Sequence, residues 1–534
     1  MPPPRLTFHG AARAVTGSCF RLETDHGQIL IDCGLFQGSK TEKELNYRPF
    51  PFAPGGIAAV ILSHAHIDHA GLLPKLVKHG FSGPIHATPA TRDLAGVMLP
   101  DSAHIQEIEV EQFNRRAARR DRGSVTPIYT GADAAACLDL FQPHPYDSWF
   151  AVLPGLRARF WNAGHLLGSA SVEIEVSQGE GDPLRILFSG DIGPDYKLMQ
   201  PDPTGPSNLD YLICEATYGD RDRIDATADR RRKLLCDEVR AAMHPDGALL
   251  IPSFAVERAQ ELISDLGRLI TQGDLPQIPI YVDSPLATKA TRVFARHHRD
   301  LEEGAVLMKS LKSKNLHFPE TREQSIALDR VQGFHIVIAA SGMCEAGRIR
   351  HRLKNWIWRD EATVLFTGFQ AAGTLGRILR DGATSVRIQG DEFAVRARIR
   401  SLDLYSGHAD GTELRDWIVE RLPVRHQVFL VHGEDPAITG LAARLDGTVA
   451  AADVLRPELD EGFALTATGA ARLASAGGPR LDPGQVAHPD SHNDMSRLVL
   501  DINAALRASP DEAARMALMR RLHRALSDGQ RPDT

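Results

Sequence analysis

The sequence predicts an α/β protein, and its patterning and composition support that prediction. Short apolar runs bounded by turn residues alternate with amphipathic stretches along most of the 534 residues, which is the pattern of buried strands separated by helices. Hydrophobic residues make up 43% and charged residues 24% of the chain, and this balance excludes a mainly disordered or fibrous protein. At roughly 150 residues per domain, the length predicts two to four domains.

The individual elements follow from those apolar runs. Strands are predicted at residues 28–32, 58–63, 185–189, 211–214, 249–253, 278–282, 336–340, 364–367 and 428–431. Helices are predicted in the amphipathic stretches between them, for example at 256–270 and 347–358.

Several classes of protein are excluded at this point. No apolar stretch approaches the roughly 18 residues of a membrane-spanning helix, and the opening MPPPRLTFHG lacks the pattern of a secretory signal. The six cysteines are scattered singly without a CxxC pair, so we expect reduced thiols in a cytoplasmic protein. The net charge of −7 argues against a globally basic surface for nucleic acid. A polyanionic substrate would therefore need a local cationic channel or metal ions.

A composition shift marks the C-terminal tail, residues 466–534. Its first part, 466–491, is rich in Ala, Gly, Pro, Ser and Thr and is predicted to be a linker. A helical hairpin is predicted over about 494–528, with Ser509 as the N-cap of its second helix. That helix carries a narrow apolar stripe of Met519, Leu522 and Leu526. Because such a stripe has to be buried somewhere, we expect the tail to mediate self-association or docking of a partner.

The strongest chemical signal is the segment SHAHIDHAG at 63–71. The predicted strand 58–63 delivers His64 and His66 at its end, and Asp68 with His69 follows at the opening of a helix. So many imidazoles and carboxylates are unfavourable in a hydrophobic core, because each would need a hydrogen-bond partner when buried. Mixed nitrogen and carboxylate ligands suit Zn²⁺, so this segment predicts a metal site.

Further ligand-type residues occur where other predicted strands meet glycines. His165 stands in NAGHLLGSA, Asp191 in SGDIG directly after the strand 185–189, and His432 in VHGE directly after the strand 428–431. Each of them alone would more often belong to an ordinary turn. Together with the first segment, they predict that several strand ends complete a site for more than one ion.

The order of these residues resembles the metallo-β-lactamase fold. The order consists of Asp32, the motif His64-x-His66-x-Asp68-His69, then His165, Asp191 and His432. Further motifs resemble the β-CASP branch of that superfamily, namely CEATYG with Glu215, IPSFAVERAQELI at 251–263, ASGMCEAGR at 340–348, YSGHAD with His408, and LVHGE with His432. The closest resemblance is to the RNA-processing exonuclease-like ribonucleases, which are related to the nuclease subunit of the cleavage and polyadenylation specificity factor. Gly407 departs mildly from the family pattern, which usually has Ala there.

The resemblance, which spans about 1–465, implies an αββα metallo-β-lactamase sandwich that is split by an insert. Residues 1–219 and 396–465 would form the sandwich. Residues 220–395 would form an α/β β-CASP domain that closes over the site as a lid. The tail has no counterpart in the resemblance.

The resemblance also implies a ligand set and a mechanism. His64, His66 and His165 would hold one Zn²⁺, Asp68, His69 and His432 a second, and Asp191 would bridge the two; Mn²⁺ stays open as an alternative metal. Asp32 would support the ligands without binding metal. Asp68, Glu215 and His408 are the predicted catalytic residues. The metals would activate a water, and His408, oriented by Glu215, would protonate the leaving oxygen.

Single-stranded RNA is the expected substrate, because family members that act on RNA carry His where His432 stands. Thr16, Ser341, Gly342 and Arg377 are candidate contacts to the RNA backbone. Three alternatives stay open: a hydrolase of a small ester, lactam or thioester on the same fold, a non-catalytic RNA-binding scaffold, and a DNA-acting nuclease. The sequence separates neither endonuclease from exonuclease nor one direction of digestion from the other.

Overall fold

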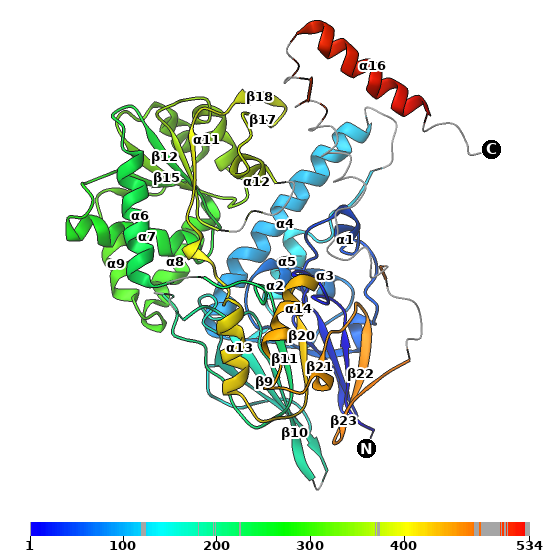
Figure 1. Ribbon diagram of the computed structural model, residues 1–534. Helices are drawn as coiled ribbons and strands as arrows, with labels where there is room; N and C mark the ends of the chain where they lie inside the picture. Colours follow the sequence, from blue (N-terminus) through cyan, green and yellow to red (C-terminus); the bar gives the residue numbers. More distant parts are fainter. Residues whose placement is uncertain are drawn as a thin grey trace.

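A computed structural model gives the fold. It describes residues 2–534 except 119–123, 180, 196, 198, 224–225, 369, 371–373, 475–479, 482–501, 503–504, 507–508, 510 and 529–534, and only the backbone of 116–118, 523 and 525–528. The described residues form a part built on two sheets, a second part built on one parallel sheet, and a C-terminal helix (Figure 1).

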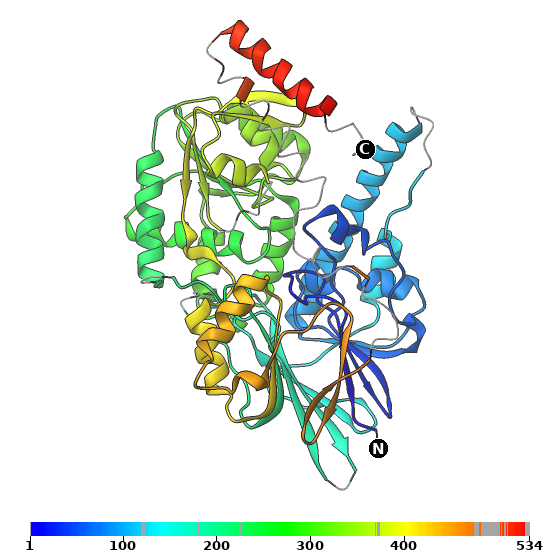
Figure 2. The same ribbon diagram turned by 45° about the vertical axis from the view of Figure 1, so that its right-hand side comes forward.

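The first sheet of the two-sheet part contains strands from the start of the chain and from residues 461–472. Eight of the described strands lie in the order β23-β22-β1-β2-β3-β4-β5-β6. They are β1 (Arg5–Phe8), β2 (Phe20–Thr24), β3 (Gly27–Ile31), β4 (Ile57–Ile61), β5 (Ile85–Ala87), β6 (Phe141–Pro143), β22 (Glu461–Thr466) and β23 (Gly469–Arg472). Helices α1 (Lys40–Glu44), α2 (Ile67–Ala70), α3 (Leu73–Lys78), α4 (Pro89–Ala118) and α5 (Gly131–Leu138) accompany this sheet, and α4 projects past it (Figure 2).

The second sheet contains seven of the described strands, in the order β21-β20-β11-β10-β9-β8-β7. They are β7 (Phe150–Leu153), β8 (Leu156–Asn162), β9 (Ala170–Gln178), β10 (Gly181–Phe188), β11 (Leu209–Glu215), β20 (Val424–Val431) and β21 (Val454–Leu455). Helices α13 (Gly411–Glu420) and α14 (Asp435–Arg444) pack on its outer face.

The two sheets face each other across a shared apolar core. Phe8 of β1 lies 5.3 Å from Phe429 of β20, and Phe20 of β2 lies 5.9 Å from Phe188 of β10, measured between ring centroids. Burial of such inner faces is the main stabilising contribution in a two-sheet core. Helices outside both sheets complete four layers, so the predicted αββα sandwich is confirmed.

The insert leaves and re-enters the sandwich between two neighbouring strands. β11 and β20 pair in parallel, with Cys214 opposite Leu430 and Glu215 opposite Val431, although more than two hundred residues of sequence separate them. Because the carboxyl ends of parallel neighbours meet at one edge, the residues after β11 and β20 are brought together at the point where the insert begins.

The insert is itself α/β. Its sheet has the order β14-β13-β15-β12-β16-β19, and each adjacent pair is parallel. The strands are β12 (Ala248–Pro252), β13 (Ile280–Val282), β14 (Leu316–His317), β15 (His335–Ala339), β16 (Thr363–Phe366) and β19 (Arg398–Ser401), with a separate hairpin of β17 (Ser385–Ile388) and β18 (Asp391–Ala394). The helices are α6 (Ala228–Ala242), α7 (Arg258–Gln272), α8 (Pro285–Arg296), α9 (Gly304–Leu311), α10 (Arg322–Ala327), α11 (Ile349–Trp356) and α12 (Leu375–Arg380). Since β19 belongs to this sheet, the insert's sheet continues beyond the predicted boundary at 395.

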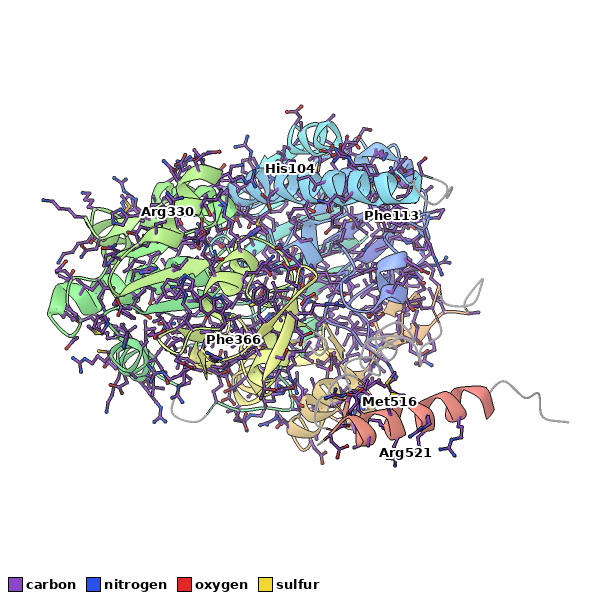
Figure 3. The ribbon with its side chains drawn as sticks, turned by 90° about the horizontal axis from the view of Figure 1, so that it is seen from above. His104, Phe113, Arg330, Phe366, Met516 and Arg521 are labelled. Carbon is purple, nitrogen blue, oxygen red and sulfur yellow. The ribbon has the colours of Figure 1, made fainter. Side chains whose placement is uncertain are left out.

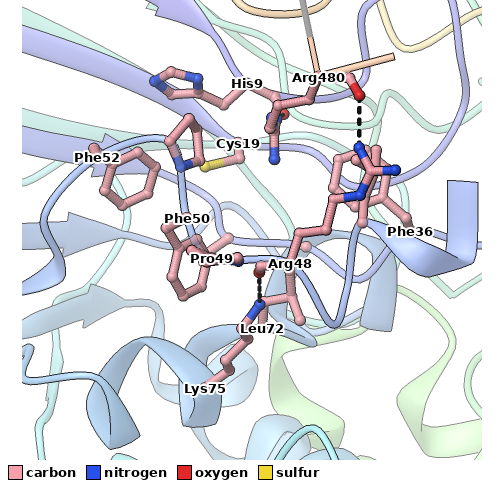
Figure 4. A pocket seen from close by; sticks show the side chains of 14 residues that line it. His9, Cys19, Phe36, Arg48, Pro49, Phe50, Phe52, Leu72, Lys75 and Arg480 are labelled. Carbon is pink, nitrogen blue, oxygen red and sulfur yellow. Dashed lines mark hydrogen bonds between the residues drawn. The ribbon is translucent and has the colours of Figure 1, made fainter.

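The start of the tail also differs from the prediction. β23 continues the first sheet beyond residue 466, where a linker was predicted. Arg480 then folds back onto the sandwich: its Nε donates to Asp460 Oδ2 at 2.9 Å, and its carbonyl accepts from Arg48 Nη1 at 2.8 Å at the edge of a small pocket (Figure 4). Leu481 is buried in the same region.

The tail ends in helix α16 (Glu512–Asp528). Asp511 accepts a hydrogen bond from Ala514 N at 2.7 Å, whereas the hydroxyl of Ser509, the predicted N-cap, donates to Ala505 O. The helix therefore begins slightly later than predicted. Most of the first helix of the predicted hairpin lies outside the described residues. Seen from above, Met516 and Arg521 on α16 lie far from His104 and Phe113 on α4 (Figure 3). Among the described residues, no helix is long and apolar enough to cross a membrane.

Candidate metal centre and active site

The ligand-type residues sit in loops at one edge of the sandwich. His64 and His66 follow β4, Asp68 and His69 lie in α2, and the remaining residues come from the second sheet. These are His165 between β8 and β9, Asp191 after β10, and His432 after β20. The loop after β4 is held by close packing: a Cβ at Gly34 would lie 1.6 Å from the carbonyl oxygen of Asp68, so only glycine fits there.

The first group of side chains is His64, His66, His165 and Asp191. His66 Nδ1 lies 3.1 Å from His64 Nε2 and 3.1 Å from His165 Nε2. Asp191 Oδ2 lies 3.4 Å from His64 Nε2 and 3.5 Å from His165 Nε2. Four atoms that bind one Zn²⁺ tetrahedrally at about 2.0–2.2 Å are about 3.3–3.6 Å apart, which is close to these separations.

The second group is Asp68, His69 and His432. His69 Nε2 lies 3.1 Å from His432 Nε2, and Asp68 Oδ2 lies 3.7 Å from the same atom. The other oxygen of Asp191 faces this group, with Oδ1 3.2 Å from His69 Nε2 and 3.7 Å from His432 Nδ1. One carboxylate thus presents one oxygen to each group, which is the geometry of a bridging ligand.

The outward nitrogens of the imidazoles are held by neighbouring groups. His69 Nδ1 lies 2.7 Å from Asp32 Oδ2, and His165 Nδ1 lies 2.7 Å from the carbonyl oxygen of Gly407. A carbonyl oxygen only accepts, so Nδ1 of His165 carries the proton and its Nε2 presents a lone pair to the first group. This is the arrangement that orients histidines in metal sites. Asp32 thus lies beside a candidate ligand, where a supporting residue was predicted.

The electrostatics of the first group favour the forms that bind metal, whereas in the second group nearby carboxylates outweigh burial and raise the pKa of His69 and His432. Burial and the neighbouring His64 lower the pKa of His66 to about 3, and burial with His408 holds the pKa of His165 well below its usual value. Burial disfavours ionisation of Asp191, but the rings of His432, His69 and His64 outweigh it and keep its pKa well below the usual range. Neutral imidazoles and an ionised carboxylate are the protonation states that bind a dication.

These residues fit a pair of divalent ions. Asp191 Oδ1 is buried and accepts no hydrogen bond from the described residues, although two imidazoles face it. A buried carboxylate oxygen left in this way is costly unless a cation lies nearby. Asp32 and His432 also have φ angles of 60° and 48°, which is rare for residues other than glycine and typical of functional sites.

His408 and Glu215 form a pair beside both groups. His408 Nδ1 lies 3.2 Å from Glu215 Oε1, and this oxygen also accepts from Ile192 N at 2.6 Å. The ring of His408 lies 4.6 Å from that of His165 and 6.2 Å from that of His432, measured between centroids. Its side chain is 21% exposed, whereas Glu215 is buried.

The residues predicted to contact substrate are not part of this cluster. The Thr16 hydroxyl bonds the backbone of Gln37. Ser341 and Gly342 lie in the insert, where the Ser341 hydroxyl accepts from Ala346 N and Gly342 packs against Phe254. Arg377 lies on α12 and donates through Nε to Asp381, the residue directly after that helix, at 2.7 and 2.9 Å.

The structure adds partners that were not found in the sequence. Thr217 Oγ1 lies 3.2 Å from His432 Nδ1, and Ser63 Oγ lies 3.1 Å from His64 Nδ1. Lys197 and Glu257 contact the loop of His165. Thr217 and Ser63 stand within the motifs CEATYG and SHAHIDHAG, so these motifs were a usable signal for them, and Glu257 likewise lies within IPSFAVERAQELI at 251–263. Nothing in the local sequence marks Lys197.

Comparison with known proteins bears on the sandwich and on the insert. A family model described as the metallo-beta-lactamase superfamily matches residues 12–218, a Beta-Casp domain matches 259–379, and a Zn-dependent metallo-hydrolase RNA specificity domain matches 392–454. The chain is 38% identical over 448 residues to Ribonuclease TTHA0252 of Thermus thermophilus, covering 83% of this chain and 96% of that protein.

Two archaeal proteins are also similar. The chain is 30% identical over 461 residues to transcription termination factor FttA of Methanosarcina mazei, covering 82% of this chain and 68% of that protein. It is 28% identical over 434 residues to an RNase J-like protein of Methanocaldococcus jannaschii, covering 80% and 92%. The fold, the order of the matched domains and these relatives lead to one conclusion: the chain is a metal-dependent hydrolase and belongs to the β-CASP ribonuclease family of the metallo-β-lactamase superfamily.

Proposed function

We propose that this protein hydrolyses phosphodiester bonds of single-stranded RNA with the help of two Zn²⁺ ions. The observation that carries the proposal is the carboxylate of Asp191, whose two oxygens face two separate groups of ligand-type side chains. The description of the RNA specificity domain matched at 392–454 and the name of the Thermus relative support RNA as the substrate.

His64, His66, His165 and Asp191 would hold one ion, and Asp68, His69, His432 and Asp191 the other. When bound, the ions would polarise the phosphate and lower the pKa of a water molecule toward neutrality. The protein's part is to orient the imidazoles, through Asp32 on His69 and the Gly407 carbonyl on His165. Two fixed dications would also attract a polyanion to a chain whose net charge is −7.

His408 would supply the proton that the leaving oxygen requires. Glu215 Oε1 faces Nδ1 of its ring, which leaves Nε2 to donate toward a substrate at the cluster. The adjacent rings of His165 and His432 keep His408 within reach of both ions. Buried Glu215 receives hydrogen bonds from Ile192 N and Thr217 N, so its position is fixed before substrate arrives.

Metal analysis combined with end-labelled substrates tests this function. Purified protein should carry close to two transition-metal ions per chain, and removal of them by a chelator should abolish cleavage until Zn²⁺ or Mn²⁺ is restored. RNA labelled at either end should be cleaved, and the product lengths will separate endonuclease from exonuclease. Faster cleavage of matched single-stranded DNA, or of a small ester or lactam, would contradict the proposal. Metal and RNA binding without hydrolysis would instead indicate a scaffold.

We also propose that the tail joins two copies of this chain. Met516 and Met519 of α16 are 44% and 46% exposed, and such an apolar stripe is stabilised when a partner covers it. Truncation after Leu481 keeps the contacts of Arg480 and Leu481 with the sandwich. This truncation should reduce the mass measured by light scattering while cleavage of short RNA stays within about twofold. An unchanged mass would contradict self-association.

We also propose that the protein is located in the cytoplasm. All six cysteines are free and buried, which supports a reducing compartment, because thiols of cytosolic proteins are kept reduced. Fractionation of the source cells would test it.

A further inference from the structure

A buried ion pair joins the insert to the loop that carries His165. Lys197 follows β10 in the sandwich, and Glu257 directly precedes α7 in the insert. Lys197 Nζ lies 3.7 Å from Glu257 Oε1, and both residues are about 95% buried (4% and 5% exposed). Charges are rarely buried so completely without a specific use, because removing them from water is costly.

Both members of the pair bind the backbone around His165. Lys197 Nζ donates to the carbonyl oxygen of His165 itself. Glu257 Oε2 accepts from Leu167 N at 3.2 Å, and the carboxylate also accepts from Gln200 Nε2 at 3.1 Å. A side chain of the insert thus holds the His165 loop directly at Leu167, and it pairs with Lys197, which holds the carbonyl oxygen of His165.

The backbone at Glu257 is arranged for this contact and not for its own helix. Its φ and ψ are 65° and −62°, and its side chain makes no capping hydrogen bond to α7. A positive φ at a residue other than glycine is strained and persists where the surroundings impose it. The observed strain points to a role across the domain boundary.

We infer that Glu257 is a positioning residue through which the insert fixes the His165 loop, so that binding of the first metal ion depends on how the insert is seated. The inference rests on the proposed two-metal site. It assigns to the insert a function inside the metal centre in addition to covering substrate. Since His165 belongs to only one of the two groups, loosening its loop should weaken one ion and spare the other.

The test compares Glu257→Gln and Glu257→Ala in the full chain. Zn²⁺ affinity is measured by competition with a chromogenic chelator, and single-turnover cleavage of a short RNA is measured separately. Loss of an outer partner of a metal ligand typically costs about 10–100-fold in affinity, so Glu257→Ala should weaken one of the two ions by that factor. Glu257→Gln keeps an acceptor for Leu167 N and should lose less. The cleavage rate should fall while the KM for short RNA stays unchanged.

Asp283→Asn is the matched control. Asp283 is also buried in the insert, where it pairs with Arg348 at 2.9 Å and Arg352 at 3.3 Å, both within the insert. This variant should lower the melting temperature without changing either Zn²⁺ affinity. The inference is overturned if both Glu257 variants bind two ions as tightly as the wild type, if both ions weaken equally, or if Asp283→Asn weakens one ion to the same extent. Wild-type protein that binds two ions but does not cleave RNA would refute the proposed function, and the affinity comparison would still decide the role of Glu257.

Discussion

The candidate metal-ligand cluster and the predicted RNA contacts are held in different ways. The imidazoles of His64, His69, His165 and His432 are buried. Outward nitrogens are fixed by distant parts of the chain, such as Asp32 for His69 and Gly407 for His165. Arg377 is 38% exposed and is held by Asp381, directly after its own helix. A substitution in the cluster should disturb several residues, because each side chain there is held by several others. A substitution of Arg377 should disturb only its local ion pair. Substitutions in the two regions should therefore differ in kind as well as in size.

The largest effect is expected for His66→Ala. Nδ1 of His66 lies 3.1 Å from two other imidazoles of the first group, so its loss removes the ligand atom at the centre of that group. The variant should lose at least one metal ion by elemental analysis, and cleavage should fall below detection.

His86→Ala is the control for His66→Ala, because His86 Nδ1 likewise lies 2.9 Å from another imidazole, that of His144, outside the cluster. The control should keep the metal content of the wild type. A metal-free His66→Ala protein that is fully active would contradict the ligand assignment.

A smaller loss without loss of metal is expected for His408→Ala. A positioned general acid contributes about 10²–10⁴-fold, and single-turnover cleavage should drop by that factor while metal content and RNA binding persist. Glu215→Gln alone should do less damage. The double variant should cost little more than His408→Ala, because residues that act as a unit are not additive. Loss of an ion from His408→Ala would show that His408 is a ligand, and a wild-type rate would show that water supplies the proton.

Asp32→Asn should weaken metal binding by about 10–100-fold. Asp32 accepts from Ser63 N at 2.7 Å and lies 2.7 Å from His69 Nδ1, and an amide cannot accept at both positions. Asn tolerates the left-handed backbone of Asp32, so strain is not added. The measurement is Zn²⁺ affinity by chelator competition.

Asp460→Asn is the control for Asp32→Asn. Asp460 also has a positive φ, 65°, and its Oδ1 lies 2.8 Å from His9 Nδ1, away from the cluster. This control should lose thermal stability and keep its Zn²⁺ affinity. Equal losses of affinity in the two variants would place the effect in the fold and not at His69.

Sequence patterns predicted the core of the fold because its strands are apolar runs. β12 and β20, for example, lie within a residue or a few residues of the predicted 249–253 and 428–431. The strands that extend past the predicted boundaries are β19 (RIRS) and β23 (GAAR), whose side chains are mostly exposed or half-exposed. An edge strand buries few side chains, so it carries no apolar signal.

The cluster shows the same limit within the site. Its ligand types could be predicted because they stand in consecutive motifs at strand ends. The residues that fix them could be predicted only where they belong to a motif or to the family order, as Ser63 and Asp32 do. Glu257 lies within the motif IPSFAVERAQELI, but that motif does not indicate its contact with Leu167, which depends on how two domains are seated. A contact between residues so far apart in the chain produces no periodic pattern in the sequence from which it could be predicted.

The smallest effect is expected for Arg377→Ala. Its ion pair with Asp381 spans one helical turn on an exposed surface, where such pairs contribute about 0.3–0.5 kcal/mol, so the melting temperature should barely change. If Arg377 contacts the RNA backbone, its loss should raise the KM for RNA a few-fold and leave kcat unchanged, because one phosphate contact is removed and the cluster is untouched. Arg380→Ala on the same helix is the control, and it should leave the KM unchanged. The decisive measurement is the KM and kcat of each variant at two salt concentrations, since removing a phosphate contact reduces the salt dependence of binding. A fall in kcat comparable to that of His408→Ala would show that Arg377 reaches the reacting phosphate. The distinction between the buried cluster and the exposed RNA contacts would then fail at this residue.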